Sequence, residues 1–168
     1  MKHALWTTAL LAVLPLACAS SAVAAPEAPA RPAAPSEACR PTGAVLFEID
    51  HRVTPGAKLS TSTVKVFATG AWTRTEADAE GKPVAPRAGC IAAPELNQLE
   101  TALDGAAWKV TSARIRCMAI SAEFTEYQVH GKLVYTQRLC SGQSLDEASR
   151  AKLDAAIAKV DRELAKAP

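Results

Sequence analysis

Cysteine pairs two to four residues apart are absent from this 168-residue chain, and so is any cluster of lysine and arginine. Structural zinc sites usually show such cysteine pairs, so the spacing speaks against a metal site. The 19 basic and 17 acidic residues are interspersed, and aromatic residues do not alternate with basic ones. We therefore expect no metal, no cofactor and no nucleic-acid partner.

Catalytic motifs are also lacking. No serine lies in a Gly-x-Ser-x-Gly elbow, and no glycine-rich loop has the spacing of a phosphate or dinucleotide site. Outside the N-terminal leader only His51 and His130 are candidate bases. Asp50 precedes His51, but alternation along a strand sends their side chains to opposite faces, so they cannot form a base and its orienting partner. The sequence predicts a protein that is not an enzyme.

A small hydrolase is the enzymatic alternative. It would require a concave pocket that joins His51 or His130 to a carboxylate and a hydroxyl group. The simpler interpretation is that His51 is a partly buried strand residue and that His130 is a solvated residue in a turn.

The N-terminus has the pattern of a signal peptide. Met1-Lys2-His3 is followed by an apolar run from Ala4 to Leu16, which is too short to span a bilayer. Ala22-Val23-Ala24 fits a cleavage site, so we predict a signal peptide over residues 1–24. The protein is expected to be exported: periplasmic, secreted or anchored at the cell surface.

Cys18 offers an alternative to simple cleavage. It follows Leu14-Pro15-Leu16-Ala17, and Ala17 suits a lipidation signal whereas Pro15 does not. A lipid on Cys18 would be the one predicted contact with a membrane. Either way, the Ala/Pro-rich stretch that follows predicts an extended, disordered tether over residues 25–38 and a single domain over residues 39–166.

Four cysteines remain in this domain, and an even number in an exported protein indicates two disulfides. We favour Cys117–Cys140, because these residues flank a predicted hairpin, together with Cys39–Cys90. The alternative is Cys90–Cys117 with Cys39–Cys140. Each bridge would contribute about 2–4 kcal/mol by restricting the unfolded chain.

Alternation of apolar residues predicts strands over 44–53 and 63–74, and a hairpin of 123–129 with 132–140 that turns at His130-Gly131. A shorter strand within 84–91 contains Pro86, which suits only an edge or a bulge. In the hairpin, a three-residue loop would place Val129 opposite Leu133 and Tyr127 opposite Tyr135.

Two helices are expected. Pro94 opens the first, whose apolar stripe contains Leu99, and a capping box at Ser144–Glu147 opens the second, which runs to about Ala165. The order β-β-(β)-α-β-β-α predicts an α+β fold. It would be an antiparallel sheet of four to five strands with both helices on one face, stapled by two disulfides.

The setting of three cysteines resembles that of the bacterial subtilisin-inhibitor family over about half of the chain. Cys90 precedes a short helix, Cys117 precedes a candidate binding loop, and Cys140 closes a late hairpin. The loop residues are Met118, Ala119, Ile120 and Ser121. The resemblance implies that this loop would bind a protease. Two departures are Cys39, which lies before the first strand, and the long C-terminal helix.

The predicted export, the predicted disulfides and the lack of a catalytic motif together predict a non-enzymatic binding module. Its partner would be a protein or a small ligand, which the sequence does not identify. The alternative is a secreted protease inhibitor that presents the loop near Met118–Ser121, since inhibitors use rigid loops pinned by disulfides.

Overall fold

The structure is a computed structural model, and it describes residues 39–54, 56–104, 107–114, 116 and 121–166. The predicted signal peptide, tether and lipidated Cys18 lie outside these residues and stay predictions. The strands are β1 (Val45–Val53), β2 (Thr61–Phe67), β3 (Ala71–Ala77), β4 (Pro83–Cys90), β5 (Val110–Ser112), β6 (Glu123–Val129), β7 (Lys132–Arg138) and β8 (Gln143–Leu145). The helices are α1 (Ala93–Leu103) and α2 (Glu147–Lys166).

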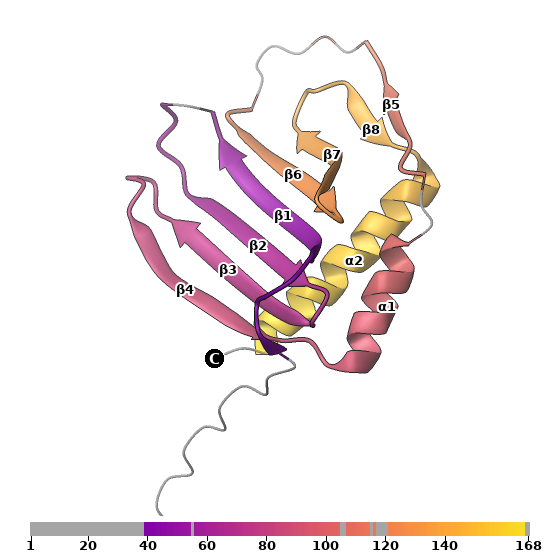
Figure 1. The fold of residues 1–168 in the computed structure, drawn as a ribbon. Coiled ribbons are helices and arrows are strands. Elements are labelled where there is room, and N and C mark those ends of the chain that lie inside the picture. The colour runs from indigo at the N-terminus through magenta and orange to yellow at the C-terminus, as the bar shows by residue number, and fades with distance from the viewer. Residues whose placement is uncertain (1–38, 55, 105–106, 115, 117–120, 167–168) are drawn as a thin grey trace, which may run out of the picture. The chain divides into compact units, whose positions relative to one another are not determined.

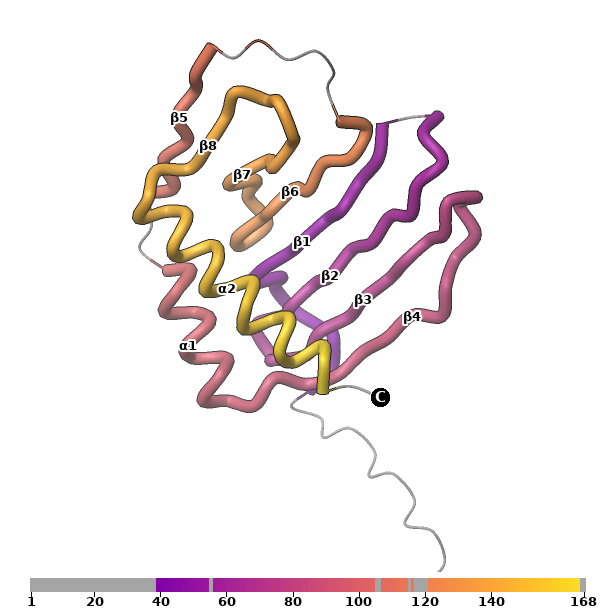
Figure 2. The backbone as a smooth tube through the Cα atoms, turned by 180° about the vertical axis from the view of Figure 1, so that it is seen from behind, coloured from indigo at the N-terminus to yellow at the C-terminus, as the bar shows by residue number. Residues whose placement is uncertain are grey.

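The α+β class is confirmed, with more strands than predicted. Six strands form one antiparallel sheet in the order β4-β3-β2-β1-β6-β7, and β5 pairs with β8 in a small second sheet. Both helices lie on one side of the six-stranded sheet, as Figures 1 and 2 show from opposite directions. Neither helix in the described part of the chain is long and apolar enough to cross a membrane.

The predicted strand over 63–74 is in fact two strands. The chain turns at Gly70, whose φ of +79° suits glycine, and its N–H bonds back to the Phe67 carbonyl. The prediction missed this turn because Val64, Val66 and Trp72 do share one face, as a single strand would require. They share it because β3 returns antiparallel beside β2, with Val66 directly opposite Trp72.

The core lies between the helices and one face of the sheet. Phe47, Val66 and Leu99 are fully buried there, together with the Val160 side of α2. The helical period of the sequence predicts an apolar stripe on α2 made of Leu153, Ile157, Val160 and Leu164. This stripe is largely correct, although Ala156 is also buried and Ile157 is only partly buried. The helices therefore dock on the sheet through their apolar faces, as their periodicity indicates.

Pro86 lies on an edge strand, as predicted. β4 is the outermost strand of the sheet, and its register against β3 shifts between Arg74 and Glu76, where the segment with Pro86 bulges. A residue without a backbone N–H is tolerated at such a place, and proline on an edge discourages pairing with another chain.

Trp72 fills the space left by a glycine on the neighbouring strand. It is 2% exposed and lies directly opposite Gly89. A Cβ atom on Gly89 would lie 2.6–2.8 Å from three atoms of the indole ring. Such distances are too short for a Cβ atom. β3 and β4 can therefore pair at this point only because Gly89 has no side chain.

One disulfide joins Cys39 to Cys90, which confirms this predicted pair and excludes the alternative pairing. Its Cα atoms are 5.9 Å apart, and it ties the start of the domain to the end of β4. The predicted Cys117–Cys140 bridge includes Cys117, which lies outside the described residues, so this second bridge stays a prediction. A disulfide is typical of proteins that have left the cytosol.

The β6–β7 hairpin is confirmed, but its loop is shorter than expected. His130 and Gly131 both have positive φ and form a two-residue turn, so Val129 faces Lys132 and not Leu133. A bulge then restores the predicted pairing of Tyr127 with Tyr135, whose rings stack with centroids 6.3 Å apart. As a result Leu133 is not buried but 57% exposed.

The predicted capping box at Ser144–Glu147 is wrong. Ser144 belongs to β8, and α2 begins at Glu147, so Asp146 is the residue that caps it. The Asp146 carboxylate accepts a hydrogen bond of 2.8 Å from the Ser149 backbone N–H. Hydrogen bonding to Ser149 lowers the pKa of Asp146, because it favours the charged form.

We predict that Gly89→Ala destabilises the protein by about 1–3 kcal/mol, because the new methyl group would overpack against Trp72. This exceeds the roughly 0.5–1 kcal/mol that alanine gains over glycine in a strand. Urea denaturation measures the effect, with Ala88→Ser on the exposed part of the same strand as control. Equal stability of Gly89→Ala and wild type would contradict this packing.

A second prediction concerns Asp146 and pH. Its pKa is lowered on folding, so its contribution is complete above the ordinary pKa of about 3.9 and is lost as the pH falls through the folded value. Wild type should be more stable than Asp146→Asn at pH 6, and this advantage should disappear in acid. Thermal denaturation between pH 2.5 and 7 measures it. A constant difference across that range would rule out the cap as the cause.

Candidate functional site

The two ends of β1 define two ends of the domain. Near the first end, Cys39 is bonded to Cys90, and this is where the tether would join. At the other end Thr54 lies beside Ala122, so we call it the loop end (Figure 1). A strand of nine residues separates them by roughly 30 Å.

The predicted binding loop lies at the loop end, but only its last residue is described. Met118, Ala119 and Ile120 lie outside the described residues, as does Cys117, whereas Ser121 precedes β6. Both sides of this segment are attached to the rest of the fold. On one side the Ala113 N–H bonds to the Gly142 carbonyl at 2.7 Å, and on the other the Thr54 N–H bonds to the Ala122 carbonyl at 2.7 Å.

Arg138, at the end of β7, joins three parts of the loop end. Its Nε donates to the Ser121 carbonyl at 3.1 Å, and a terminal NH2 group donates to Thr54 Oγ1 at 3.1 Å. The guanidinium also lies over the Phe124 ring, 5.5 Å from its centroid. Thr54 Oγ1 in turn donates to the Ala122 carbonyl at 3.0 Å. We call these five residues the loop root.

A cleft opens on the helix-bearing side of the sheet, beyond the apolar rows that the helices cover. Thr125, His51, Ser62 and Glu76 are successive cross-strand neighbours there. The last three line a cleft of about 400 Å³ together with Arg74. The cleft therefore holds a histidine, hydroxyl groups and two carboxylates, Glu76 and Asp78. Asp78 accepts hydrogen bonds from the backbone N–H groups of Glu80 and Lys82.

This cleft has the residue types that the hydrolase alternative requires, but not their arrangement. His51 Nδ1 lies 3.2 Å from Thr125 Oγ1, so its partner is a hydroxyl group of β6 and not a carboxylate. Glu76 forms an ion pair with Arg74. A triad needs the histidine between the nucleophile and the carboxylate, whereas here Ser62 lies between His51 and Glu76 in the cross-strand row.

His130 has a carboxylate partner in a different setting. Its Nε2 lies 3.5 Å from Asp104, at the end of α1, and both side chains are more than half exposed. This position in a solvated turn is the one that the sequence predicts. Within the described ranges, no group of three or more His, Cys, Asp or Glu side chains is close enough to hold a metal ion.

The face of the sheet opposite the helices is polar. Arg52 lies 2.6 Å from Asp50 and 3.5 Å from Glu126, and the hydrogen bond and charge of Asp50 raise the pKa of Arg52. Asp50 is 8% exposed and also accepts a hydrogen bond from Thr63. Lys65 pairs with Glu48 at 3.4 Å on the same face. Over the described residues of β1, β2 and β6, these charged side chains pair with one another and make this face polar.

Tyr127 is a buried polar residue on the helix side of the sheet, in contrast to the charged residues on the opposite face. It is 6% exposed on the helix side, and its hydroxyl donates to Gln137 at 2.9 Å. Burial raises the pKa of this hydroxyl, and the neighbouring Tyr135 adds to the shift. The group is a neutral structural residue at physiological pH.

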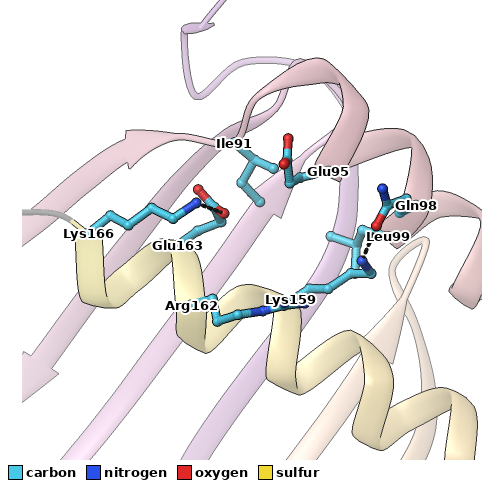
Figure 3. Close-up of a pocket in the computed structure, with 8 residues that line it drawn as sticks. All are labelled: Ile91, Glu95, Gln98, Leu99, Lys159, Arg162, Glu163 and Lys166. Atoms are coloured by element: carbon cyan, nitrogen blue, oxygen red, sulfur yellow. Dashed lines mark hydrogen bonds and ion pairs between the residues drawn. The ribbon is translucent and has the colours of Figure 1, made fainter.

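A groove between the two helices is a second hollow place (Figure 3). Lys159 reaches Gln98 across it at 2.5 Å, and Lys166 pairs with Glu163 on the same helix. The groove encloses only about 110 Å³ above Ile91 and mixes charges of both signs. Of these two contacts, the one between Lys159 and Gln98 connects α1 to α2.

No family model, no curated protein and no solved structure matches this chain. Its function is therefore argued from its own residues.

The loop root was not predicted from the sequence, although the predicted hairpin already contained one of its residue pairs. The predicted pairing of Tyr127 with Tyr135 places Phe124 opposite Arg138, as the structure has it. The contact of Arg138 with Thr54 was not predictable from local patterns, because it requires β1 to pair with β6.

We predict that Asp50→Asn destabilises the protein by about 1–3 kcal/mol, because Asp50 is nearly buried and accepts from both Arg52 and Thr63, and the amide offers only one acceptor oxygen. Glu126→Gln is the matched control, since Glu126 is more exposed and lies farther from Arg52, and its effect should be smaller. Urea denaturation ranks the two variants. The reverse order would show that Asp50 does not hold this face together.

Proposed function

We propose that this chain is an exported, non-enzymatic binding module that contacts a protein partner with its loop end. The observation that carries the proposal is the attachment of segment 113–121 on both sides. Ala113 is bonded beside Cys140 through Gly142, and Ser121 and Ala122 are bonded to the ends of β7 and β1. A segment held at both roots binds with a smaller loss of conformational entropy than a free one.

An exposed apolar side chain supports the same surface. Leu139 directly follows Arg138 and is 74% exposed, more than any other large apolar residue in the described part of the chain. On the polar face of the sheet, charged side chains form ion pairs with one another, so this face offers a partner fewer groups to bind. Loops on a rigid sheet are also where binding residues most often lie.

The proposal places this domain outside the cytosol. The Cys39–Cys90 disulfide fits an oxidising compartment, and the predicted signal peptide or a lipid on Cys18 would deliver the domain there. The tether would join at Cys39, at the opposite end of β1 from Thr54.

Protease inhibition is the second candidate, and the loop root favours it specifically. Ser121 is the last residue of the predicted binding loop, and its carbonyl is fixed by Arg138. Inhibitors of this kind depend on a loop that is fixed before the protease binds, since a loose loop is cleaved as a substrate. The predicted Cys117–Cys140 bridge would fix the other part of this loop.

The test is a pulldown from the native periplasm or medium with the mature chain as bait. Wild type is compared with Leu139→Asp and with Leu133→Asp, a matched change at the other end of β7 where the side chain is 57% exposed. We expect a partner that wild type and Leu133→Asp retain and Leu139→Asp loses. A partner retained by all three proteins would place the binding surface elsewhere.

Titration against a subtilisin-like protease separates the second candidate from the first. Loss of protease activity at a stoichiometric amount of the chain would establish inhibition. Full protease activity at that amount would exclude inhibition. The pulldown would then still decide whether the chain binds a protein partner.

A further inference from the structure

We infer that the cleft beside His51 and Ser62 is a binding site for a neutral ligand with many hydroxyl groups, of the carbohydrate class. The inference does not depend on the proposed protein partner, because none of the loop-root residues lines this cleft. It rests on the side chains of the cleft and on which of their polar groups the protein already uses.

The cleft lies on one row of side chains that crosses five strands. From β6 to β4, the successive cross-strand neighbours are Thr125, His51, Ser62, Glu76 and Val84. Adjacent strands are about 4.8 Å apart, so the row is roughly 19 Å long. The ends of β1–β4 that carry it lie away from both helices (Figures 1 and 2). The cleft of about 400 Å³ is large enough for a small ligand, since such pockets usually enclose about 300–1,000 Å³.

Several polar groups of the cleft are not used by the protein itself. The hydroxyl groups of Ser60 and Ser62 form no hydrogen bond within the described part of the chain. His51 Nδ1 lies 3.2 Å from Thr125 Oγ1, and the other ring nitrogen of His51 has no partner among the described residues. These groups can therefore bond to a ligand without breaking a contact inside the protein.

The two carboxylates of the cleft, in contrast, already have partners. Glu76 forms an ion pair with Arg74, and Asp78 accepts hydrogen bonds of 2.8 and 3.1 Å from two backbone N–H groups. A cationic ligand would have to compete with these partners. An anionic ligand is disfavoured because the two carboxylates outnumber the one guanidinium that lines the cleft. The groups that remain are neutral, so they match a neutral ligand.

A carbohydrate has the chemistry that such a cleft can bind. Each sugar hydroxyl both donates and accepts hydrogen bonds, as the two serines do, and it can also bond to the unused nitrogen of His51. The C–H faces of a sugar ring are apolar, and Val84 offers an apolar contact at the end of the row, where it is 45% exposed. The length of the row favours a short oligosaccharide over a single sugar.

The test is a titration of the oxidised mature chain, followed through its backbone amide and histidine signals in NMR spectra. The probes are neutral di- and trisaccharides of glucose, galactose, mannose and N-acetylglucosamine at millimolar concentration, with spermidine as a cationic and citrate as an anionic probe. We expect at least one sugar to shift the signals of His51, Ser62 and Glu76 in a saturable way. The inference is overturned if no sugar shifts them, or if a charged probe binds as tightly as the best sugar.

Ser62→Val tests the position of the site. It removes a hydroxyl group and adds two methyl groups in the middle of the cleft, so the best sugar should bind at least about tenfold more weakly. The fold should tolerate the change, because valine favours strands and the Ser62 hydroxyl has no internal hydrogen bond to lose. Thr75→Val is the matched control on the opposite face of the sheet, where Thr75 is exposed, and it should keep the affinity within about twofold of wild type.

Ser62→Ala keeps the test decisive if Ser62→Val does not fold. It removes only the hydroxyl, and the loss of one neutral hydrogen bond should weaken sugar binding roughly two- to tenfold. Unchanged affinity in the Ser62 variants, or an equal loss in Thr75→Val, overturns the inference. A chain that binds a sugar but captures no protein in the pulldown would support the cleft while the proposed function fails.

Discussion

The antiparallel pairing of β1 with β6 is the contact on which the rest of the structure depends. β1 pairs with β2 on one side and with β6 on the other, so it joins a four-stranded meander to the later hairpin. This pairing makes one apolar face wide enough for both helices. It also brings Thr54 beside Ala122, which creates the loop root. Without it the chain would hold two small sheets, each with half a core.

The two faces of this sheet follow from that arrangement. The helix side is apolar where α1 and α2 cover it and becomes polar at His51 and Ser62, where they do not. The other face is solvated, and its charges pair in a network around Arg52. At this uncovered end of the sheet His51 lies within hydrogen-bond distance of Thr125, and Glu76 pairs with Arg74.

Several features were predictable because they depend on neighbours in the sequence. The period of two in β1, the stripe of α2, the proline at the start of α1 and the tyrosine pair of the hairpin all follow from local patterns. The predictions were wrong where one local sequence pattern fits two different structures. The stretch 63–74 alternates in the same way as one strand or as a tight β2–β3 hairpin, and Ser144 and Asp146 are both good capping residues.

The sequence by itself determined the α+β class, the apolar face of each main element and the case for export, because these depend on composition and short-range periodicity. Only the tertiary structure decided the six-strand order, the pairing of Cys39 with Cys90 and the contact of Arg138 with Thr54. The physical reason is distance along the chain. Thr54 and Arg138 are 84 residues apart, and the bond between them forms only when β1 and β6 have paired, which no local pattern records.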